Sequence, residues 1–395
     1  MDKNILSKKT ALVVDDEEFM RDFLSTVIKQ VGIENVLTAT GGQQALDIIL
    51  SRSEPFDYVF CDLQMPEMDG IEVIRHLAAI DYSSGIVLFS GENQRILETA
   101  HSIAEARGLN LLGSLTKPVS VESLYQMLVN YQVAEKKSLW SSPEVSAEEL
   151  QAALLAGDIT VYYQPQVNIE SMEVKGVEAL ARWNHAEKGM VPPDIFIDLA
   201  EQHQLIDAVT ETVIKQTCQQ GAIWSSQGRK FKLSINLSMD NLHSLDFPDR
   251  LMALVKSTGM DIKNLIFEIT ESVLVKDFNT CMDILTRLRL KGPELSIDDF
   301  GTGYASMDHL KRMPFSELKI DRAFVTGAHS NGTARAILES SIYLAKHLQM
   351  TTVAEGVENK QDLDLVASLG CDLVQGYYIA RPMDAAAFDS WFEQR

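Results

Sequence analysis

Several common sequence features are missing from this chain of 395 residues, and each absence argues against a class of function. The four cysteines, Cys61, Cys218, Cys281 and Cys371, are widely separated and form no CxxC pair, which favours reduced thiols in or near cores over a disulfide framework. Lysine and arginine number 35 against 56 for aspartate and glutamate, a formal net charge of −21. We therefore expect no broad surface for DNA or anionic membranes.

Long apolar runs are also missing. The sequence has no apolar stretch of about 20 residues and no charged-then-apolar leader, so we expect no membrane insertion, no signal peptide and a cytoplasmic location. The histidines His185, His203, His309 and His347 show no spacing typical of metal ligands. We therefore expect them to be surface or core residues.

The length and a hydrophobic content of 46% indicate two globular domains. A polar, turn-prone stretch that contains Glu135–Ser138 and Ser141–Pro143 separates them. We predict an N-terminal domain at 1–132, a linker at 133–146 and a C-terminal domain at 147–395. Within the linker, Trp140 either packs against one domain and fixes their relative angle, or is exposed.

The N-terminal domain alternates short apolar segments with amphipathic ones. The apolar segments 11–14, 57–61, 85–89 and 111–116 lead into Asp15-Asp16, Asp62, Ser90 and Lys117, respectively. Near-continuous apolar strands joined by helices predict a doubly wound, flavodoxin-like α/β domain with a parallel sheet. Functional side chains in such folds lie at the carboxyl ends of the strands.

These polar residues suggest phosphoryl chemistry. Three carboxylates in one crevice repel one another unless a hard cation is present, which implies one Mg²⁺. With Mg²⁺ held by Asp15 or Asp16 and by Asp62, an aspartate oxygen can attack a phosphoryl group. Lys117 would neutralise the charge of that group and Ser90 would hydrogen-bond it. Any one of these residues alone is more typical of a solvated loop or a helix cap.

This ordered set, together with the stretch Asp62–Gly70, resembles the receiver domain of response regulators over residues ~9–132. The resemblance implies phosphorylation of Asp62 by a partner histidine kinase. One position departs from the pattern: Ser114 lies three residues before Lys117, where receivers usually have an aromatic residue. Phosphorylation chemistry is expected to survive, whereas the usual aromatic relay is in question.

The C-terminal domain contains eight short apolar segments that each end in a polar residue suited to metal or phosphate chemistry. These residues are Gln164, Glu178, Asn236, Glu268, the pair Asp298-Asp299, Lys319, Glu355 and Gln375. Most of the segments are separated by enough residues for a helix. We therefore predict a TIM-like (β/α)8 barrel with its chemistry at the C-terminal ends of the strands.

Oxygen ligands alone favour Mg²⁺ or Mn²⁺ over Zn²⁺. Asp298 and Asp299 can serve one site only where the strand ends and the backbone turns, which Gly301 and Gly303 would allow. An aspartate bridging two ions, with Asp299 and Glu355 on the second, would form a two-metal site for phosphodiester hydrolysis. Taken singly, such acids are equally typical of turns and helix caps.

Lysine and glutamate complete the predicted site. Protonated Lys319 cannot bind a metal, so we assign it to the nucleophilic water or to the scissile phosphate. Glu355 could accept the proton of that water, directly or through the second metal. Taken alone, Lys319 could instead be an outward-facing strand residue.

Five motifs carry a second resemblance, which covers roughly residues 147–395. They are Glu178–Trp183, Asp298–Tyr304, Lys319–Asp321, Ala354–Glu358 and Gln375–Tyr377. This half of the chain resembles the EAL-domain cyclic di-GMP phosphodiesterases, which implies hydrolysis of cyclic di-GMP to linear pGpG with two Mg²⁺ or Mn²⁺ ions. It also implies homo-oligomerisation through this domain. Ala305, where a serine is common, is expected only to adjust the packing of the 298–306 loop.

The resemblance implies a role for each matched residue. The catalytic residues would be Glu355, Lys319, Asp299 and Glu178. The metal ligands would be Glu178, Asn236, Glu268, Asp298, Asp299 and Glu355. The substrate contacts would be Gln164, the backbone of Leu180, Arg182, Pro193, Gln375 and Pro382. Glu271 would anchor the mobile loop.

Other functions compete with this one. The alternative is a catalytically silent receptor for cyclic di-GMP, or a protein-interaction module; such modules usually lose a ligand, whereas every matched position is filled here. No GGDEF-like sequence supports a diguanylate cyclase, and no segment of helix-turn-helix size lies outside the barrel. We further expect phosphorylation of Asp62 to change the loop or the dimer interface of the barrel, with a sign that the sequence leaves open.

Overall fold

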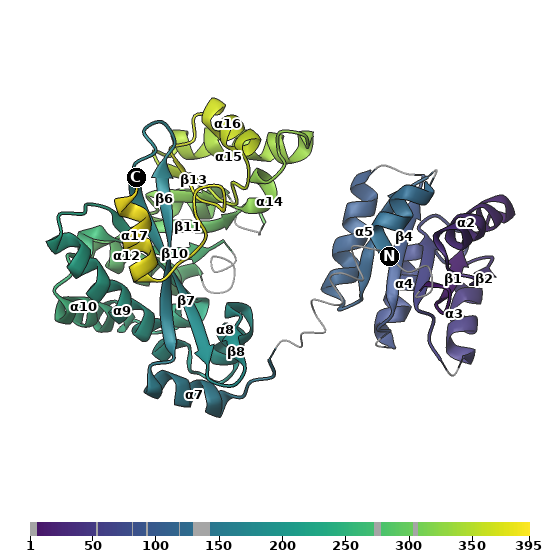
Figure 1. The fold of residues 1–395 in the computed structure, drawn as a ribbon, viewed down its shortest axis with the longest axis horizontal. Helices are drawn as coiled ribbons and strands as arrows, with labels where there is room; N and C mark the ends of the chain where they lie inside the picture. Colours follow the sequence, from purple (N-terminus) through teal and green to yellow (C-terminus); the bar gives the residue numbers. More distant parts are fainter. Residues whose placement is uncertain are drawn as a thin grey trace. The chain divides into compact units, whose positions relative to one another are not determined.

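The computed structural model describes residues 6–52, 54–80, 82–91, 94–117, 119–128, 143–271, 278–302 and 307–395. Two compact units make up the chain, Met1–Ser141 and Ser142–Arg395 (Figure 1). Trp140, Gly303, Tyr304 and Ala305, to which the sequence assigned local roles, lie outside the described residues, as do the linker residues 133–142.

The first unit is a five-stranded parallel sheet with helices on both faces. Its strand order is β2-β1-β3-β4-β5, which is the order of flavodoxin-like folds. The strands are β1 (Thr10–Val14), β2 (Asn35–Ala39), β3 (Tyr58–Asp62), β4 (Gly85–Ser90) and β5 (Leu111–Thr116). Its helices include α2 (Glu18–Val31), α3 (Gly42–Ser51), α4 (Gly70–Ala79) and α5 (Gln94–Ala106). The predicted doubly wound fold is confirmed.

Alternation along the central strands divides the core of this unit into two layers. Leu12 and Val59 belong to one apolar cluster, whereas Val13 and Phe60 belong to the other, because successive side chains of a strand point to opposite faces. Strand β2 was not among the predicted strands. It forms an edge of the sheet, and three of its five residues are exposed, so it lacks the continuous apolar run of a buried strand.

The second unit is a closed barrel. Its sheet has the order β6-β14-β13-β12-β11-β10-β9-β7-β8, and pairing of β6 with β7 closes it. The strands are β6 (Ile159–Asn168), β7 (Val174–His185), β8 (Gly189–Val191), β9 (Lys232–Leu237), β10 (Leu265–Thr270), β11 (Glu294–Phe300), β12 (Glu317–Ile320), β13 (Thr351–Ala354) and β14 (Leu373–Val374). The fold is α/β, as predicted.

One strand reverses the expected direction. β6 runs antiparallel to both of its barrel neighbours, β7 and β14, whereas β7 and β9–β14 pair in parallel. β6 and β7 therefore form a hairpin without a helix between them. The prediction that Gln164 and Glu178 end their strands is wrong: they lie opposite each other in the interior of this hairpin.

Helices surround the barrel, with α9, α10 and α12 on one side and α15 and α16 on another (Figure 1). The helices of this unit include α7 (Ala147–Ala156), α8 (Pro193–Gln202), α9 (Ile206–Ser226), α10 (Phe247–Thr258), α12 (Phe278–Lys291), α13 (Met307–Arg312), α14 (Arg322–Val325), α15 (Gly332–His347), α16 (Lys360–Ser368) and α17 (Ala385–Glu393), with 3₁₀ turns η1 (Met239–His243) and η2 (Ile262–Asn264). In the described part of the chain, none of the helices combines the length and apolar character needed to cross a bilayer.

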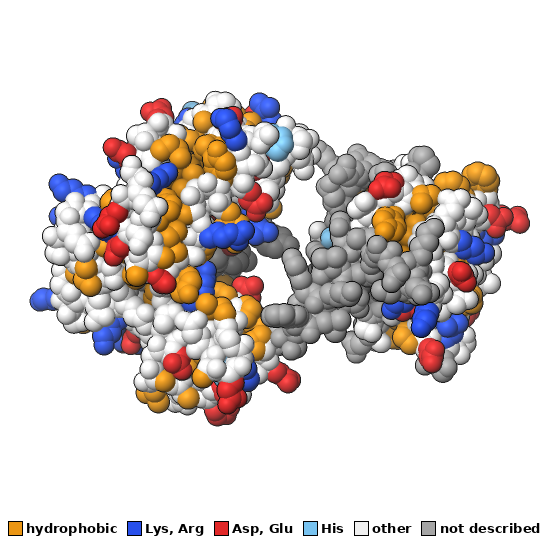
Figure 2. Space-filling view, viewed as in Figure 1, with side chains coloured by type: hydrophobic (Ala, Val, Ile, Leu, Met, Phe, Trp, Pro, Cys, Tyr) orange, Lys and Arg blue, Asp and Glu red, His pale blue; other side chains and the backbone are white. Residues whose placement is uncertain are grey.

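The apolar core of the barrel lies between the strands and the helices. On each of the strands β9 to β12, two alternate side chains belong to one large apolar cluster. In strand order these pairs are Leu233 and Ile235, Phe267 and Ile269, Leu295 and Ile297, and Leu318 and Ile320. The alternate positions are mostly polar and face the barrel axis, as the strand period of two requires. Acidic and basic side chains are interspersed on the visible outer face of this unit (Figure 2). The polar interior is what forms the candidate site.

Candidate functional site

In the first unit, the ends of β1, β3 and β4 and the residue after β5 bring the predicted phosphoacceptor group together. Carboxylate oxygens of Asp15, Asp16 and Asp62 lie within 4.8 Å of one another. Lys117 Nζ donates to Asp62 Oδ2 at 2.7 Å and to Asp15 Oδ2 at 3.0 Å. Ser90 is fully buried at the end of β4, the strand that pairs with β3. Ser114 lies on β5 opposite Leu88.

Electrostatics in this crevice favour a cation. Burial raises the pKa of Asp62, Lys117 lowers it, and the neighbouring Asp15 raises it again. One lysine does not neutralise three carboxylates, and the excess negative charge is costly because Asp15 and Asp62 are both buried. A divalent ion would relieve the remaining repulsion.

In the barrel, Lys319 lies at the centre of the acidic cluster. Its side chain is only 1% exposed, and its Nζ lies 2.7 Å from Glu268 Oε2 and 2.7 Å from Glu355 Oε1. Asp298 Oδ1 is 3.2 Å from the same nitrogen and Glu178 Oε1 is 3.7 Å away. Four carboxylates from β7, β10, β11 and the end of β13 thus converge on one ammonium group. Lys319 faces the barrel interior, not the outer face.

Asp298 and Asp299 reach the same site through an irregularity in β11. The register between β11 and β12 shifts between Ile297 and Phe300, and Asp299 has φ of 53°, a left-handed conformation that is uncommon for residues other than glycine. One oxygen each of Asp298, Asp299 and Glu355 lies within 4.8 Å of the others. The bulge therefore lets two adjacent side chains share one site.

A chain of amides supports Glu178 on the opposite wall. Asn236 Nδ2 donates to Glu178 Oε1 at 2.9 Å, and Gln375 Nε2 donates both to Glu178 Oε2 and to Gln164 Oε1. Gln164 in turn donates to the carbonyl of Ala380 at 3.0 Å. Glu178 is held by neutral donors on both oxygens, which fixes its orientation.

The pKa values show an excess of buried negative charge. Burial, opposed by Lys319, raises the pKa of Glu355 to about 8. Burial together with Asp298 raises the pKa of Asp299 to about 6, and burial raises the pKa of Glu268 well above its ordinary value. For Lys319, the effect of burial is overcome by Asp298, Glu178, Glu268 and Glu355, which raise its pKa. Added positive charge would stabilise this cluster.

The predicted loop anchor has a direct partner. Glu271 is 4% exposed, and its Oε2 accepts a hydrogen bond from the backbone N–H of Gly301 at 2.9 Å. The N–H of Glu271 donates to the carbonyl of Asp298 at 3.1 Å. Glu271 thus connects the end of β10 to both ends of the turn that presents Asp298 and Asp299.

Two cavities open beside the cluster. One, of about 200 Å³, is lined by Gln164, Glu178, Leu180, Lys319, Glu355 and Gln375. The other, of about 440 Å³, is lined by Leu180, Arg182, Pro193 and Asn236. Leu180 lies between them. Pro382 lines neither cavity; its neighbour Met383 pairs with Tyr163, next to Gln164.

The sequence reasoning missed three residues of the smaller cavity, Arg322, Glu358 and Tyr377. Glu358 and Tyr377 belong to the quoted motifs but received no role. Arg322 lies two residues after the end of β12, and a basic residue so close to a strand that carries Lys319 was the signal for it. Gly356 makes room for this arginine, since a Cβ at Gly356 would lie 2.3 Å from Arg322 Cβ.

The fold and the geometry define a class: a phosphoacceptor domain joined to a barrel whose acidic end is suited to metal-assisted phosphodiester chemistry. Residues 147–382 match the family described as EAL domain, and residues 11–129 match the response regulator receiver domain. The chain belongs to the EAL-domain family and carries an N-terminal receiver domain.

Relatives share this arrangement to different extents. Cyclic di-GMP phosphodiesterase RocR of Pseudomonas aeruginosa is 33% identical over 95% of this chain and 97% of its own length. The bifunctional diguanylate cyclase/cyclic di-GMP phosphodiesterase MucR of the same species is 30% identical over 90% of this chain, but only 50% of MucR is covered. A solved structure titled "PaMucR Phosphodiesterase, c-di-GMP complex" matches 61% of this chain and 98% of its own, with 35% identity and a TM-score of 0.59.

Proposed function

We propose that this protein hydrolyses cyclic di-GMP to linear pGpG at the acidic end of the barrel, under the control of phosphorylation at Asp62. The main structural support for this reaction is that four carboxylates converge on Lys319 beside two cavities. They belong to Glu178, Glu268, Asp298 and Glu355. RocR, which is similar over nearly its whole length, is named as a cyclic di-GMP phosphodiesterase.

The residues present suit divalent ions. Asp298, Asp299 and Glu355 offer oxygens within 4.8 Å of one another, and Glu268 Oε1 is buried with no hydrogen-bond partner among the described residues. We assign one Mg²⁺ or Mn²⁺ to Glu178, Asn236, Glu268 and Asp298, and a second to Asp298, Asp299 and Glu355. When bound, such ions supply an activated water and stabilise the developing charge on the phosphate.

The protein's own groups then have distinct roles. Lys319, held by Glu268 and Glu355 at 2.7 Å, would orient the attacking water and neutralise the phosphate. Glu355 would accept a proton from that water, directly or through the second metal. Gln375 and Asn236 would keep Glu178 in place, and Glu271 would hold the Asp298–Asp299 turn through Gly301.

We assign substrate binding to Gln164, the backbone of Leu180, Arg182, Pro193, Gln375 and Pro382. Arg182 lies beside the larger cavity with its guanidinium 5.6 Å from the ring centroid of Tyr162. A dianionic dinucleotide can bind to a chain of net charge −21 because divalent ions and a directed arginine replace a general positive field.

The direct test is to incubate the purified chain with cyclic di-GMP and Mg²⁺ and to separate the nucleotides by chromatography, with a chelator as control. Metal-dependent appearance of pGpG supports the enzyme. Intact substrate, both before and after treatment with a phosphodonor and under conditions in which binding is measured, would instead support a silent receptor.

Control by the receiver is a separate part of the proposal. We assign the receiver to residues 1–132, the linker to 133–146 and the phosphodiesterase to 147–395, with a histidine kinase as phosphodonor and one Mg²⁺ bound by Asp15, Asp16 and Asp62. A cytoplasmic location and a homo-oligomer formed through the barrel complete it. If Asp62→Ala and the wild type show the same turnover with and without a phosphodonor, control through Asp62 is excluded.

A further inference from the structure

A second large cavity opens at the end of the barrel opposite the acidic cluster. Its volume is about 710 Å³, within the range of small-molecule sites. Lys232, Glu294, Glu317, Thr351 and Leu373 each begin a parallel strand and line it. Because Asp298, Glu355 and Gln375 lie near the other ends of these strands, this cavity is separate from the proposed catalytic site. We refer to it as the lower cavity.

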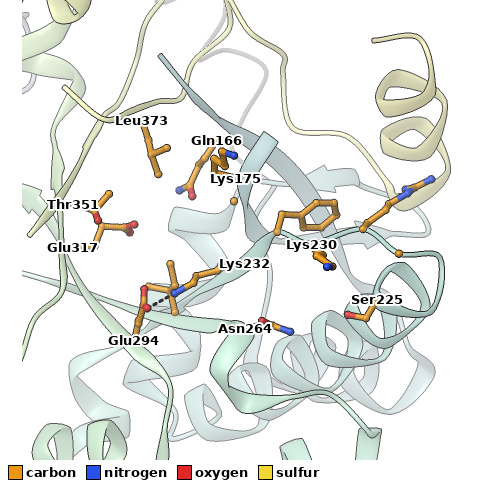
Figure 3. A pocket seen from close by; sticks show the side chains of 15 residues that line it. Gln166, Lys175, Ser225, Lys230, Lys232, Asn264, Glu294, Glu317, Thr351 and Leu373 are labelled. Atoms are coloured by element: carbon orange, nitrogen blue, oxygen red, sulfur yellow. Dashed lines mark ion pairs between the residues drawn. The ribbon is translucent and has the colours of Figure 1, made fainter. Parts of the chain in front are cut away.

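Two buried side chains on its inner wall each have an unused hydrogen-bond acceptor. Gln166 is 0% and Glu317 is 3% exposed, and Oε1 of each has no hydrogen-bond partner among the described residues. In Figure 3, both side chains point into the cavity, from β6 and from β12 respectively. Unpaired buried acceptors are costly, so this wall is suited to a group that presents hydrogen-bond donors.

The rim of the lower cavity is basic. Lys175, Arg229, Lys230 and Lys232 line it against only two acids, Glu294 and Glu317. Three of these four cations already have an acidic partner. Lys232 is paired with Glu294, as the dashed line in Figure 3 shows, Arg229 is paired with Asp389, and Lys175 is paired with Glu173. Lys230 is exposed and has no ion-pair partner in the described part of the chain. Lys230 is therefore the rim cation that can pair with an anionic group of a ligand, with the three paired cations beside it.

The rim and the inner wall of the cavity suit different chemical groups, which could be the two ends of one ligand. The rim fits a phosphate, and the inner wall fits neighbouring N–H donors. Apolar side chains between them, Phe231, Ile266 and Leu373, fit a flat ring. Among nucleobases, guanine carries adjacent ring and exocyclic N–H donors on one edge, whereas adenine carries a single amino donor beside an acceptor nitrogen.

We propose that the lower cavity binds a guanine mononucleotide, with the base edge on Glu317 and Gln166 and the phosphate on Lys230 and its neighbours. The site is separate from the phosphodiesterase site, and its occupation does not depend on that activity. Gly176 contributes to this arrangement: a Cβ there would lie 2.4 Å from Gln166 Oε1, so a side chain at this position would displace the amide oxygen.

Gln166 also connects the lower cavity to the catalytic end. Its Nε2 donates to Gln375 Oε1 at 2.9 Å, and Gln375 Nε2 donates to Glu178. A donor bound at Gln166 Oε1 would polarise the same amide that contacts Gln375. The nucleotide would therefore bind at one end of a continuous hydrogen-bond chain whose other end is a proposed metal ligand.

The test is calorimetric titration of the full-length chain with GMP, AMP and inorganic phosphate in chelator, where no divalent ion can hold phosphate at the acidic end. We expect saturable binding of GMP at one site, and at least tenfold weaker binding of AMP and phosphate. Glu317→Gln replaces one acceptor oxygen by an NH₂ donor and should weaken GMP at least tenfold. Lys230→Ala should weaken GMP several-fold, whereas Lys215→Ala, an exposed lysine outside the cavity, should not.

Arg322→Ala, at the catalytic end, separates the two cavities and should leave GMP binding unchanged. Three results would overturn the proposal: no saturable binding of GMP, equal affinity for GMP, AMP and phosphate, or loss of binding in Arg322→Ala with Glu317→Gln and Lys230→Ala unaffected. Lys230 is exposed, so its variant keeps the test valid even if Glu317→Gln fails to fold. Failure of phosphodiesterase activity would not change any of these outcomes.

Discussion

Glu317 provides a quantitative prediction that needs neither ligand nor metal. This glutamate is 3% exposed at the start of β12, and burial raises its pKa to about 7, against the lowering effects of Ser296 and Lys319. In the unfolded chain the same group titrates at its ordinary value of 4.5. Between these two values the folded barrel keeps a proton that the unfolded chain has released.

The consequence for stability follows from this difference. As pH rises from about 4.5 to about 7, the unfolded state binds fewer protons than the folded state, so the free energy of unfolding falls. At about 1.4 kcal/mol per pH unit, the total loss is ~3 kcal/mol above pH 7. Glu317→Gln has nothing to titrate, so its stability relative to wild type should rise by this amount between pH 4.5 and pH 8.

The assay is urea unfolding of the full-length chain in chelator, followed by tryptophan fluorescence. Trp183, Trp224 and Trp391 all lie in the barrel and the receiver residues 1–132 contain no tryptophan, so the signal reports mainly on the barrel. Glu187→Gln, which removes the same charge from an exposed position, corrects for the change in net charge. A stability difference between Glu317→Gln and wild type that stays constant from pH 4.5 to pH 8 would refute the reasoning.

Three further predictions concern the catalytic end. Gly356→Ala should destabilise the barrel by ~2–4 kcal/mol in urea unfolding, because φ is 66° and the new Cβ would lie 2.3 Å from Arg322 Cβ. The control Gly327→Ala, with φ of 74° but nothing within 4 Å, should cost only ~1–2 kcal/mol. Equal losses in the two variants would exclude a contribution from the clash with Arg322. Lys319→Met should lower the melting temperature in chelator, because the loss of this buried counter-ion should reduce the free energy of unfolding by ~3–5 kcal/mol. Mg²⁺ should then stabilise the variant more than the wild type. An equal Mg²⁺ response in both would contradict the role of Lys319 as the counter-ion. Glu271→Ala should reduce turnover about tenfold or more by releasing the N–H of Gly301, with Glu271→Gln intermediate, and unchanged turnover and metal affinity would rule out the anchor.

The parts of the fold that could be predicted are those in which local pattern and burial agree. β1, β3 and β4 were predicted because strands buried on both faces have continuous apolar runs. β2 was missed because an edge strand with three exposed residues has no such run. In the barrel, the apolar runs were recognised correctly. They did not show that β6 and β7 continue past these runs as one antiparallel hairpin, so Gln164 and Glu178 were wrongly placed at strand ends.

The same limit applies to the candidate site. Adjacent Asp298 and Asp299 predicted a turn, and the structure has a bulge with Asp299 in a left-handed conformation. The position of Arg322 shortly after β12 could be read from the sequence, but its close approach to Gly356, which follows another strand, could not. Gln166 and Glu317 lie two residues from Gln164 and Lys319 and so share their strand face. Whether that face opens into a cavity depends on loops whose conformation the sequence pattern does not determine.

The interior of this barrel explains why it can carry two polar sites. TIM barrels usually fill their interior with layers of branched apolar side chains, whereas here inward positions of β9, β11 and β12 carry Ser234, Ser296 and Glu317 beneath Asn236, Asp298 and Lys319. The apolar core is displaced outward, onto the alternate residues that pack against the helices. Because strand period separates these two sets of side chains completely, substitutions on the inward face can change chemistry without removing core contacts. Outward substitutions such as Ile297→Ala, in contrast, should cost ~2–5 kcal/mol while leaving the acidic cluster in place.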